Sequence, residues 1–323
     1  MKKINIVFLF LILSLVLIFY LINNLSKINK LEEIAGSPIQ SWLLLKQNEK
    51  SCFGRKVEES CVFNKGKQKK IVLIGDSHMA SLSSAFTDLI EKDVELTIIT
   101  GCSFYYGLQK KWYAKREDCT KKIDEDIFNY IKIKEDTLFI FHTRLVPDIN
   151  HDEVVPDLKN NNDQKKYNLR PYIFYYENEE TDSIKNPKII GESYINLHKF
   201  LSSKNNKSLI IYPIPETIFN PREKIKIFLD NLINKKIYNT IFMELNYPKK
   251  FFDERYFNTK KILDNIYADK LYKFDPTELF CDKQKCYMWK NNKLLYYDHS
   301  HLSYDGAKLI YNSLYPLIIK LLS

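Results

Sequence analysis

The sequence predicts an α/β fold in which a parallel sheet is covered by helices on both faces. Two observations carry this prediction. Short β-rich runs alternate with helical patterns along the chain. The first run, Lys69 to Gly75, holds four consecutive apolar residues, which is the pattern of a strand buried on both faces. The length of 323 residues allows one large or two medium domains, and an apolar fraction of 45% is that of an ordinary globular protein.

The chain begins with an apolar run from Ile4 to Ile22 that only Asn5 and Ser14 interrupt. At a rise of about 1.5 Å per residue, such a run nearly spans the apolar core of a bilayer. No small-x-small cleavage site follows it. We therefore predict an uncleaved signal anchor, a transmembrane helix within residues 1–25, followed by a membrane-proximal connector over residues 26–50.

Strands and helices are expected to alternate after the connector. The predicted strands lie at residues 69–75, 94–100, 137–141, 208–212 and 271–274. The predicted helices lie at residues 79–90, 123–133, 194–201, 221–234, 251–266 and 304–322. Residues 148–190 form a long, polar, Asn-rich connection, which is either disordered or a lid over a functional site.

Six cysteines lie in three local pairs. The even count and the short spacings favour disulfides and an oxidising compartment, which places the bulk of the chain outside the cytoplasm. A zinc site is the alternative, but no Cys-x-x-Cys is present, so we expect no metal. The spacing alone leaves the connectivity open. The expected pairs are Cys52–Cys61, Cys102–Cys119 and Cys281–Cys286.

The net charge of +9 comes from lysines that are scattered along the chain. No Arg-rich stripe, zinc-finger spacing or ribonucleoprotein-type aromatic motif is present, so we expect no nucleic-acid partner. A basic face near an anionic cell envelope is the simpler explanation of the charge.

Gly75-Asp76-Ser77 stands where the first buried strand passes into a helix. This junction lies at the carboxyl edge of a parallel sheet, where open α/β folds bind ligands. The helix N-terminus also stabilises negative charge. Taken alone, the tripeptide is better explained as an ordinary turn with an N-cap.

A second stretch, Asp298-His299-Ser300-His301, precedes the last predicted helix. An Asp three residues before a His can orient the imidazole and fix its tautomer, and the His can then act as general base on a serine hydroxyl. This spacing favours His301 over His299 as the base. His78 is interpreted as a helix-capping or substrate-side residue, and His142 as a core residue or a group behind the site.

Together these stretches resemble the SGNH, or GDSL-like, hydrolase superfamily. More narrowly, they resemble the extracytoplasmic SGNH domain attached to membrane acyltransferase-3 proteins that O-acetylate bacterial surface glycans. The resemblance extends over about residues 52–323. The matching stretches are Gly75-Asp76-Ser77-His78, Gly101-Cys102, Tyr212-Pro213-Ile214-Pro215-Glu216, Phe274-Asp275-Pro276-Thr277, Tyr296-Tyr297-Asp298 and His301-Leu302-Ser303.

The resemblance implies a three-layer αβα, flavodoxin-like domain over residues 51–323 with about five parallel strands. It implies Ser77 as nucleophile, His301 as general base and Asp298 as the carboxylate that holds His301. The N–H groups of Ser77 and Gly101 would bind the oxyanion. The superfamily's third donor, an Asn, is missing, and Phe141-His142-Thr143-Arg144 stands in its place. Arg144 is either a substitute donor or a member of a surface ion pair.

The implied activity is that of a membrane-anchored, extracytoplasmic serine acyltransferase that O-acetylates a bacterial surface glycan. The alternatives are a carbohydrate O-acetylesterase of the envelope and a catalytically silent glycan-binding domain. No cofactor is expected to bind directly. Because the sequence holds one apolar run long enough to span a membrane, we expect a separate multi-span acyltransferase partner to deliver the acetyl group. The expected location is the periplasm or the cell exterior.

Overall fold

The structure, a computed structural model, describes residues 45–112, 121–150, 186–217, 219–221, 224, 245–291 and 293–323. It also describes the backbone of four short strands between residues 152 and 180. The predicted membrane anchor and most of the connector therefore lie outside the described residues. Within the described part, no helix is both long enough and apolar enough to cross a bilayer.

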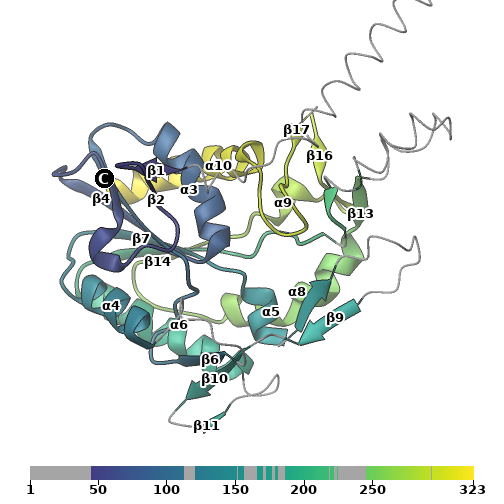
Figure 1. The fold of residues 1–323 in the computed structure, drawn as a ribbon, viewed down its shortest axis with the longest axis horizontal. Coiled ribbons are helices and arrows are strands. Elements are labelled where there is room, and N and C mark those ends of the chain that lie inside the picture. The colour runs from purple at the N-terminus through teal and green to yellow at the C-terminus, as the bar shows by residue number, and fades with distance from the viewer. Residues whose placement is uncertain are drawn as a thin grey trace, which may run out of the picture.

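A six-stranded sheet forms the centre of the molecule (Figure 1). Its strands lie in the order β14-β12-β7-β4-β5-β3, and all neighbours are parallel except β5 and β3. With the parallel strands numbered along the chain, their order from β5 to β14 is 2-1-3-4-5, that of a flavodoxin-like sheet. The bounds are β3 Cys61–Phe63, β4 Lys69–Gly75, β5 Val94–Thr100, β7 Leu138–His142, β12 Lys207–Ile211 and β14 Leu271–Phe274.

Helices cover both faces of this sheet, as Figure 1 shows. On one face α3 (Ser77–Leu89) and α10 (Tyr304–Leu322) lie side by side in the same apolar cluster as Ile71 and Leu73 of β4. On the other face α4 (Lys121–Lys132) and α6 (Asn186–Ser203) share a cluster with Val72 and Ile74. Because side chains alternate along a strand, four consecutive apolar residues supply both cores.

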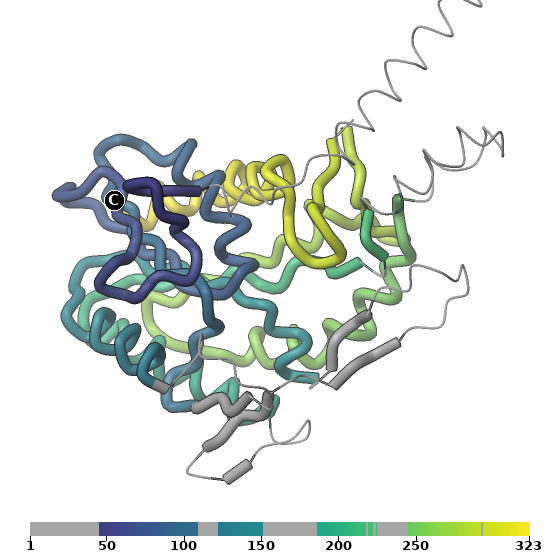
Figure 2. Tube along the Cα trace, in the orientation of Figure 1, coloured from purple at the N-terminus to yellow at the C-terminus, as the bar shows by residue number. Residues whose placement is uncertain are grey.

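The remaining elements surround the sheet. Helix α8 (Lys249–Asp264) packs against α6 and the short helix α5 (Leu145–Asn150). Figure 2 shows the yellow C-terminal helix running beside the blue α3. The other bounds are β1 Lys46–Gln47, β2 Lys50–Ser51, η1 Val57–Glu59, β6 Gln109–Trp112, β8 Asp152–Val155, β9 Lys166–Leu169, β10 Tyr172–Tyr176, β11 Glu179–Glu180, β13 Asn246–Pro248, α9 Thr277–Phe280, β15 Lys285–Tyr287, β16 Trp289–Lys290 and β17 Lys293–Leu294.

The α/β fold with a mostly parallel central sheet is confirmed. Several predicted bounds shift by one or two residues, and α6 begins at Asn186, eight residues before the predicted start. Three larger points remain. The sheet has a sixth strand, β3, which pairs antiparallel at the edge and was not predicted. The expected connection at 148–190 contains the end of α5, strands β8 to β11 and the start of α6, so it is not a structureless loop. The helix predicted at 221–234 lies almost wholly outside the described residues.

Two disulfides are present in the described part of the chain. Cys52–Cys61 ties the segment before β3 to β3 itself, and Cys281–Cys286 joins the end of α9 to β15. Cys102 is also disulfide-bonded. Its expected partner, Cys119, lies outside the described residues.

Candidate active site

Ser77 is the first residue of α3, at the carboxyl edge of the sheet. Asp76 is the N-cap, and its Oδ1 accepts the backbone N–H of His78 at 2.8 Å. Gly75 is the last residue of β4, and its φ is not positive, so no left-handed turn requires a glycine here. A Cβ at Gly75 would instead lie 1.9 Å from the carbonyl oxygen of His142. Glycine is therefore needed here because the ends of β4 and β7 approach each other closely.

Asp298 holds the loop that precedes α10. Its Oδ1 accepts the backbone N–H groups of Ser300 at 2.8 Å and of His301 at 2.7 Å, and its Oδ2 accepts from His301 Nδ1 at 2.8 Å. Burial alone would raise the pKa of Asp298. The hydrogen bonds and the charge of His301, with the two backbone donors, hold that pKa well below its ordinary value. Asp298 is therefore a carboxylate at neutral pH.

The loop and the helix N-terminus meet at one hydrogen bond. Ser77 Oγ lies 2.7 Å from His301 Nε2, although the two residues are 224 positions apart. Because the carboxylate of Asp298 can only accept, the proton of the neutral His301 ring lies on Nδ1, and Nε2 accepts the hydroxyl proton of Ser77. The three side chains form the arrangement in which an imidazole can deprotonate a serine hydroxyl. The side chains of His301 and Asp298 are 16% and 17% exposed, so solvent reaches this edge.

Asp76 connects three loops at this edge of the sheet. Its Oδ2 accepts the backbone N–H of Arg144 at 2.9 Å and the hydroxyl of Ser103 at 3.3 Å. Burial would raise the pKa of Asp76, but the neighbouring His78 and the backbone donors hold it well below its ordinary value. A buried carboxylate with these donors fixes the loops that follow β4, β5 and β7 relative to one another.

Gly101 has a different contact from the one predicted. Its φ is +149° and its N–H donates to the carbonyl oxygen of Gly75 at 3.0 Å. The N–H expected to bind an oxyanion therefore already donates to a backbone carbonyl at the edge of the sheet. An oxyanion role for Gly101 remains a prediction that requires this hydrogen bond to open.

Arg144 forms an ion pair that is mostly buried. Its Nε donates to Glu216 Oε1 at 2.6 Å, and the two side chains are 10% and 9% exposed. Burial would raise the pKa of Glu216, but the charge and the hydrogen bond of Arg144 lower it to about 2. Arg144 is thus in an ion pair, as one of the two alternatives held, but this pair is not on the surface.

His299 is held by Arg144. Arg144 Nη2 lies 3.1 Å from His299 Nε2, and since a guanidinium only donates, Nε2 accepts and the His299 proton lies on Nδ1. The backbone carbonyl of His299 accepts the N–H of Thr217 at 2.7 Å. Ser77 thus contacts His301, the histidine that the Asp-x-x-His spacing favoured. Sequence reasoning gave Glu216 no role, although the Pro-Ile-Pro-Glu stretch that contains it was part of the resemblance.

Two further histidines lie behind the site. The ring of His78 is stacked on that of His301, with a centroid separation of 4.4 Å and an interplanar angle of 28°. His142 Nδ1 donates to the carbonyl of Ile211 at 3.1 Å, and burial lowers the pKa of His142 to about 4, so it is a neutral core residue. The stacking of His78 leaves no signal in the sequence, because it depends on a loop more than 200 residues away.

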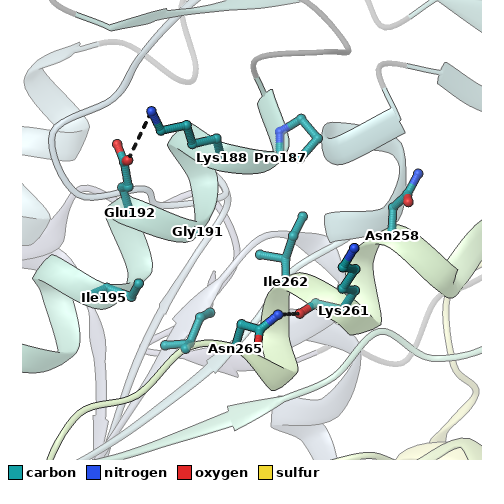
Figure 3. A pocket seen from close by; sticks show the side chains of 10 residues that line it. Pro187, Lys188, Gly191, Glu192, Ile195, Asn258, Lys261, Ile262 and Asn265 are labelled. Atoms are coloured by element: carbon teal, nitrogen blue, oxygen red, sulfur yellow. Dashed lines mark hydrogen bonds and ion pairs between the residues drawn. The ribbon is translucent and has the colours of Figure 1, made fainter.

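A groove of about 420 Å³ lies between α6 and α8, away from the triad (Figure 3). Two polar contacts in it are local: Lys188 pairs with Glu192 at 3.8 Å, and Asn265 donates to the Lys261 carbonyl at 2.9 Å. None of Ser77, Asp298 and His301 lines it. Among the described residues, no group of His, Cys, Asp or Glu has the geometry of a metal site. The chemistry of the described part therefore centres on the Ser77–His301 contact.

A comparison with protein families agrees with the fold. A family model described as the SGNH domain (fused to AT3 domains) matches residues 46–316. Among solved structures, the periplasmic domain of the lipopolysaccharide acetyltransferase of Salmonella ser. Paratyphi A is 16% identical, with a TM-score of 0.47 over 79% of this chain and 84% of that chain. A protein of Bacteroides fragilis NCTC 9343, provisionally named an acylhydrolase, is 12% identical, with a TM-score of 0.39 over 80% and 90%. Among curated proteins no significant match is found.

Proposed function

The chain belongs to the family of SGNH domains that are fused to AT3 domains, and from this membership we propose that it is a serine acyltransferase or esterase. The observation that carries the proposal is the continuous hydrogen-bonded chain from Ser77 Oγ through His301 to Asp298, with contacts of 2.7 and 2.8 Å. A serine hydroxyl is a weak nucleophile unless an adjacent base takes its proton.

In the first half-reaction Ser77 Oγ attacks the carbonyl carbon of an acyl donor while His301 Nε2 takes the hydroxyl proton. The carbonyl becomes a tetrahedral oxyanion, which the backbone N–H of Ser77 at the N-terminus of α3 would stabilise. His301 then gives the proton to the leaving oxygen, the bond to that oxygen breaks, and the acyl group remains on Ser77 as an ester. Asp298 stabilises the imidazolium that exists between the two proton transfers.

In the second half-reaction His301 takes a proton from the acceptor hydroxyl, and that oxygen attacks the acyl ester. Collapse of the second tetrahedral intermediate returns the proton to Ser77 and releases the acylated acceptor. A glycan hydroxyl as acceptor gives O-acylation, and water gives hydrolysis. The same three side chains serve both outcomes, so the acceptor decides between transferase and esterase.

For Arg144 the proposal is a role in charge stabilisation near the oxyanion. Its guanidinium is held by Glu216 and His299, and its backbone N–H by Asp76, the residue next to Ser77. A cation kept in place on this edge of the sheet would favour negative charge on the substrate. The third oxyanion donor is thus proposed to be a charged side chain in place of the superfamily's Asn.

We further propose acetyl as the acyl group, a bacterial surface glycan as the acceptor, and a multi-span AT3 protein as the partner that delivers acetyl across the membrane. The fusion of this family to AT3 domains supports that partner. The two disulfides support an oxidising compartment, the periplasm or the cell exterior, with the predicted helix in residues 1–25 as anchor.

The test is hydrolysis of p-nitrophenyl acetate by the full-length protein in detergent micelles, with and without a glycan acceptor. Ser77→Ala should lower kcat by about a thousandfold or more, because it removes the nucleophile. Ser84→Ala is the matched control: it lies on the same helix, and its hydroxyl donates to the Ser81 carbonyl at 3.2 Å. It should leave kcat unchanged.

The acceptor arm separates the candidate activities. Acetylated glycan formed only with Ser77 present supports transfer, and Ser77-dependent release of acetate whether or not acceptor is added supports an esterase. Equal rates for wild type and Ser77→Ala would refute the proposal and leave a glycan-binding domain.

A further inference from the structure

His78 is an unusual buried side chain. It follows Ser77 directly in the first turn of α3 and is 4% exposed. Its Nε2 is buried and has no hydrogen-bond partner within the described part of the chain, and Nδ1 lies 3.3 Å from Asp76 Oδ1 without the alignment of a hydrogen bond. Buried polar groups in native proteins are normally hydrogen-bonded, so an apolar residue would satisfy packing better at this position. The imidazole therefore needs an explanation other than stability.

The ring of His78 lies between two other histidine rings. Its face is stacked on His301 at 4.4 Å and 28°, and it meets His142 edge-on at 6.3 Å and 70°. His142 is itself fixed by its hydrogen bond to the Ile211 carbonyl. His78 is thus supported from behind and covers one face of His301.

Stacking supplies a restraint that the hydrogen bonds of His301 lack. Those bonds hold Nδ1 on Asp298 and Nε2 on Ser77, but they leave the ring able to tilt about the line that joins the two nitrogens. Tilting bends both hydrogen bonds away from linearity, and proton transfer depends on that alignment. A flat ring against one face of His301 removes this freedom.

The charged and titratable groups that face His78 are Asp76 on the preceding residue, His301 on the loop before α10, Arg144 after β7, and His142 at the end of β7. Burial lowers the pKa of His78, the charge of His301 lowers it further, and Asp76 partly opposes this. The stacked ring is therefore neutral, and it does not repel the imidazolium that forms on His301 during each proton transfer.

We propose that His78 is a positioning residue for the general base: its ring supports one face of His301 and keeps both His301 nitrogens aligned with Ser77 and Asp298. The inference rests on the proposed function, because it needs His301 to carry the proton. His78 does not touch the substrate in this proposal, since both of its ring nitrogens are buried.

The test compares His78→Leu with His78→Phe in the full-length protein, with p-nitrophenyl acetate as substrate. Leucine removes the flat ring, so kcat should fall by about tenfold while KM stays within about twofold. Phenylalanine keeps a stacked ring, so it should retain at least about half of the wild-type kcat. Should His78→Leu fail to fold, His78→Met, which adapts to irregular space, makes the same comparison.

His198→Leu is the matched control. His198 is a fully buried histidine of α6. Among the residues that the structure describes, its Nε2 also lacks a partner, and its ring contacts Phe141, Tyr194 and Ser208. Its replacement should lower the melting temperature but leave kcat within about twofold of wild type.

The outcomes distinguish failure of the positioning role of His78 from failure of the proposed function. A Ser77-dependent wild-type rate with an unaffected His78→Leu would overturn this inference alone, as would a His78→Phe variant as slow as His78→Leu. Wild-type and Ser77→Ala rates that are equal would overturn the proposed function and this inference with it.

Discussion

The triad and the polar cluster beside it differ in how completely their polar atoms are hydrogen-bonded. In the triad, Ser77 Oγ, both ring nitrogens of His301 and both carboxylate oxygens of Asp298 are hydrogen-bonded. The neighbouring group, called here the Arg144 cluster, leaves several atoms unpaired. It comprises Arg144, Glu216, His299, Tyr247 and Tyr296. In it Glu216 Oε2 and the hydroxyls of Tyr247 and Tyr296 are buried and have no hydrogen-bond partner among the described residues.

The carboxylates of the two regions are also kept ionised by different kinds of group. Asp298 is held ionised by His301 and by backbone donors from its own loop. Glu216 is held ionised by Arg144 from another loop, and burial together with nearby charge raises the pKa of Tyr247 and Tyr296 above the ordinary value. We infer that the triad is arranged for chemistry and leaves few buried polar atoms without hydrogen bonds, while the Arg144 cluster depends on one buried ion pair. Mutations in the triad should therefore affect activity, while mutations in the Arg144 cluster should affect stability as well as the charge that Arg144 is proposed to supply.

Asp298→Asn should have the largest effect. The amide cannot accept from His301 Nδ1 in the same way, so the ring loses the tautomer that leaves Nε2 ready for the Ser77 proton. We expect kcat to fall by about a thousandfold or more, measured as ester hydrolysis. Asp282→Asn is the control, because Asp282 also accepts two backbone N–H groups in a turn, at 2.7 Å each, and touches no histidine in the described part of the chain. A loss in Asp298→Asn no larger than in the control would contradict the triad.

Glu216→Gln should have the next largest effect, and on stability. It removes the negative charge that pairs with the guanidinium of Arg144 in a largely buried place, so the free energy of unfolding should fall by about 3 kcal/mol. Urea denaturation followed by circular dichroism measures this change. The double variant Arg144→Met/Glu216→Leu removes both charges and should recover part of the loss. A fall of under about 1 kcal/mol in Glu216→Gln would show that solvent already screens the pair.

Acid should destabilise the protein through the same carboxylate. The pKa of Glu216 is about 2 in the folded chain against an ordinary 4.5, so its contribution is present above pH 4.5 and is lost as the pH falls towards 2. From this difference we expect the loss to amount to about 3 kcal/mol of unfolding free energy. The pH series of the wild type should therefore fall more steeply over this range than that of Glu216→Gln. Parallel curves would argue against a depressed pKa.

Tyr296→Phe and Tyr247→Phe should have the smallest effect and the opposite sign. Each removes a buried hydroxyl that has no partner, so the free energy of unfolding should stay within about 1 kcal/mol of wild type or rise. Tyr105→Phe is the contrasting control, because the Tyr105 hydroxyl donates to Asp148 Oδ2 at 2.6 Å in the core. That variant should lose about 1–3 kcal/mol. Equal losses in all three would mean that the tyrosine hydroxyls of the cluster are bonded in solution.

The sequence could predict the features that depend on residues close together in the chain. Strands 94–100 and 271–274 and helix 304–322 were predicted with the bounds that the structure has, because apolar patterning is local. The motif around Ser77 and the Asp298-x-x-His301 spacing were visible for the same reason: the capping and turn hydrogen bonds join residues at most three positions apart.

What the sequence could not predict depends on distant partners. The ion pair of Arg144 joins residues 72 positions apart, and neither residue stands in a pattern that names the other. Strand β3 is three residues long and exists through its antiparallel pairing with β5. The Gly101 N–H was assigned by resemblance, and the hydrogen bond to Gly75 that occupies it follows from the approach of two chain segments.

The contact at Gly75 limits how this protein can be engineered. Even a single methyl group at position 75 would collide with the His142 carbonyl. The ends of β4 and β7 would have to move apart to accommodate it. Ser77 follows one strand end and Arg144 the other, each by two residues. Directed evolution towards a new acyl acceptor can therefore vary loop positions outside the triad and the Arg144 cluster, but a library that randomises position 75 should return glycine from every round of selection.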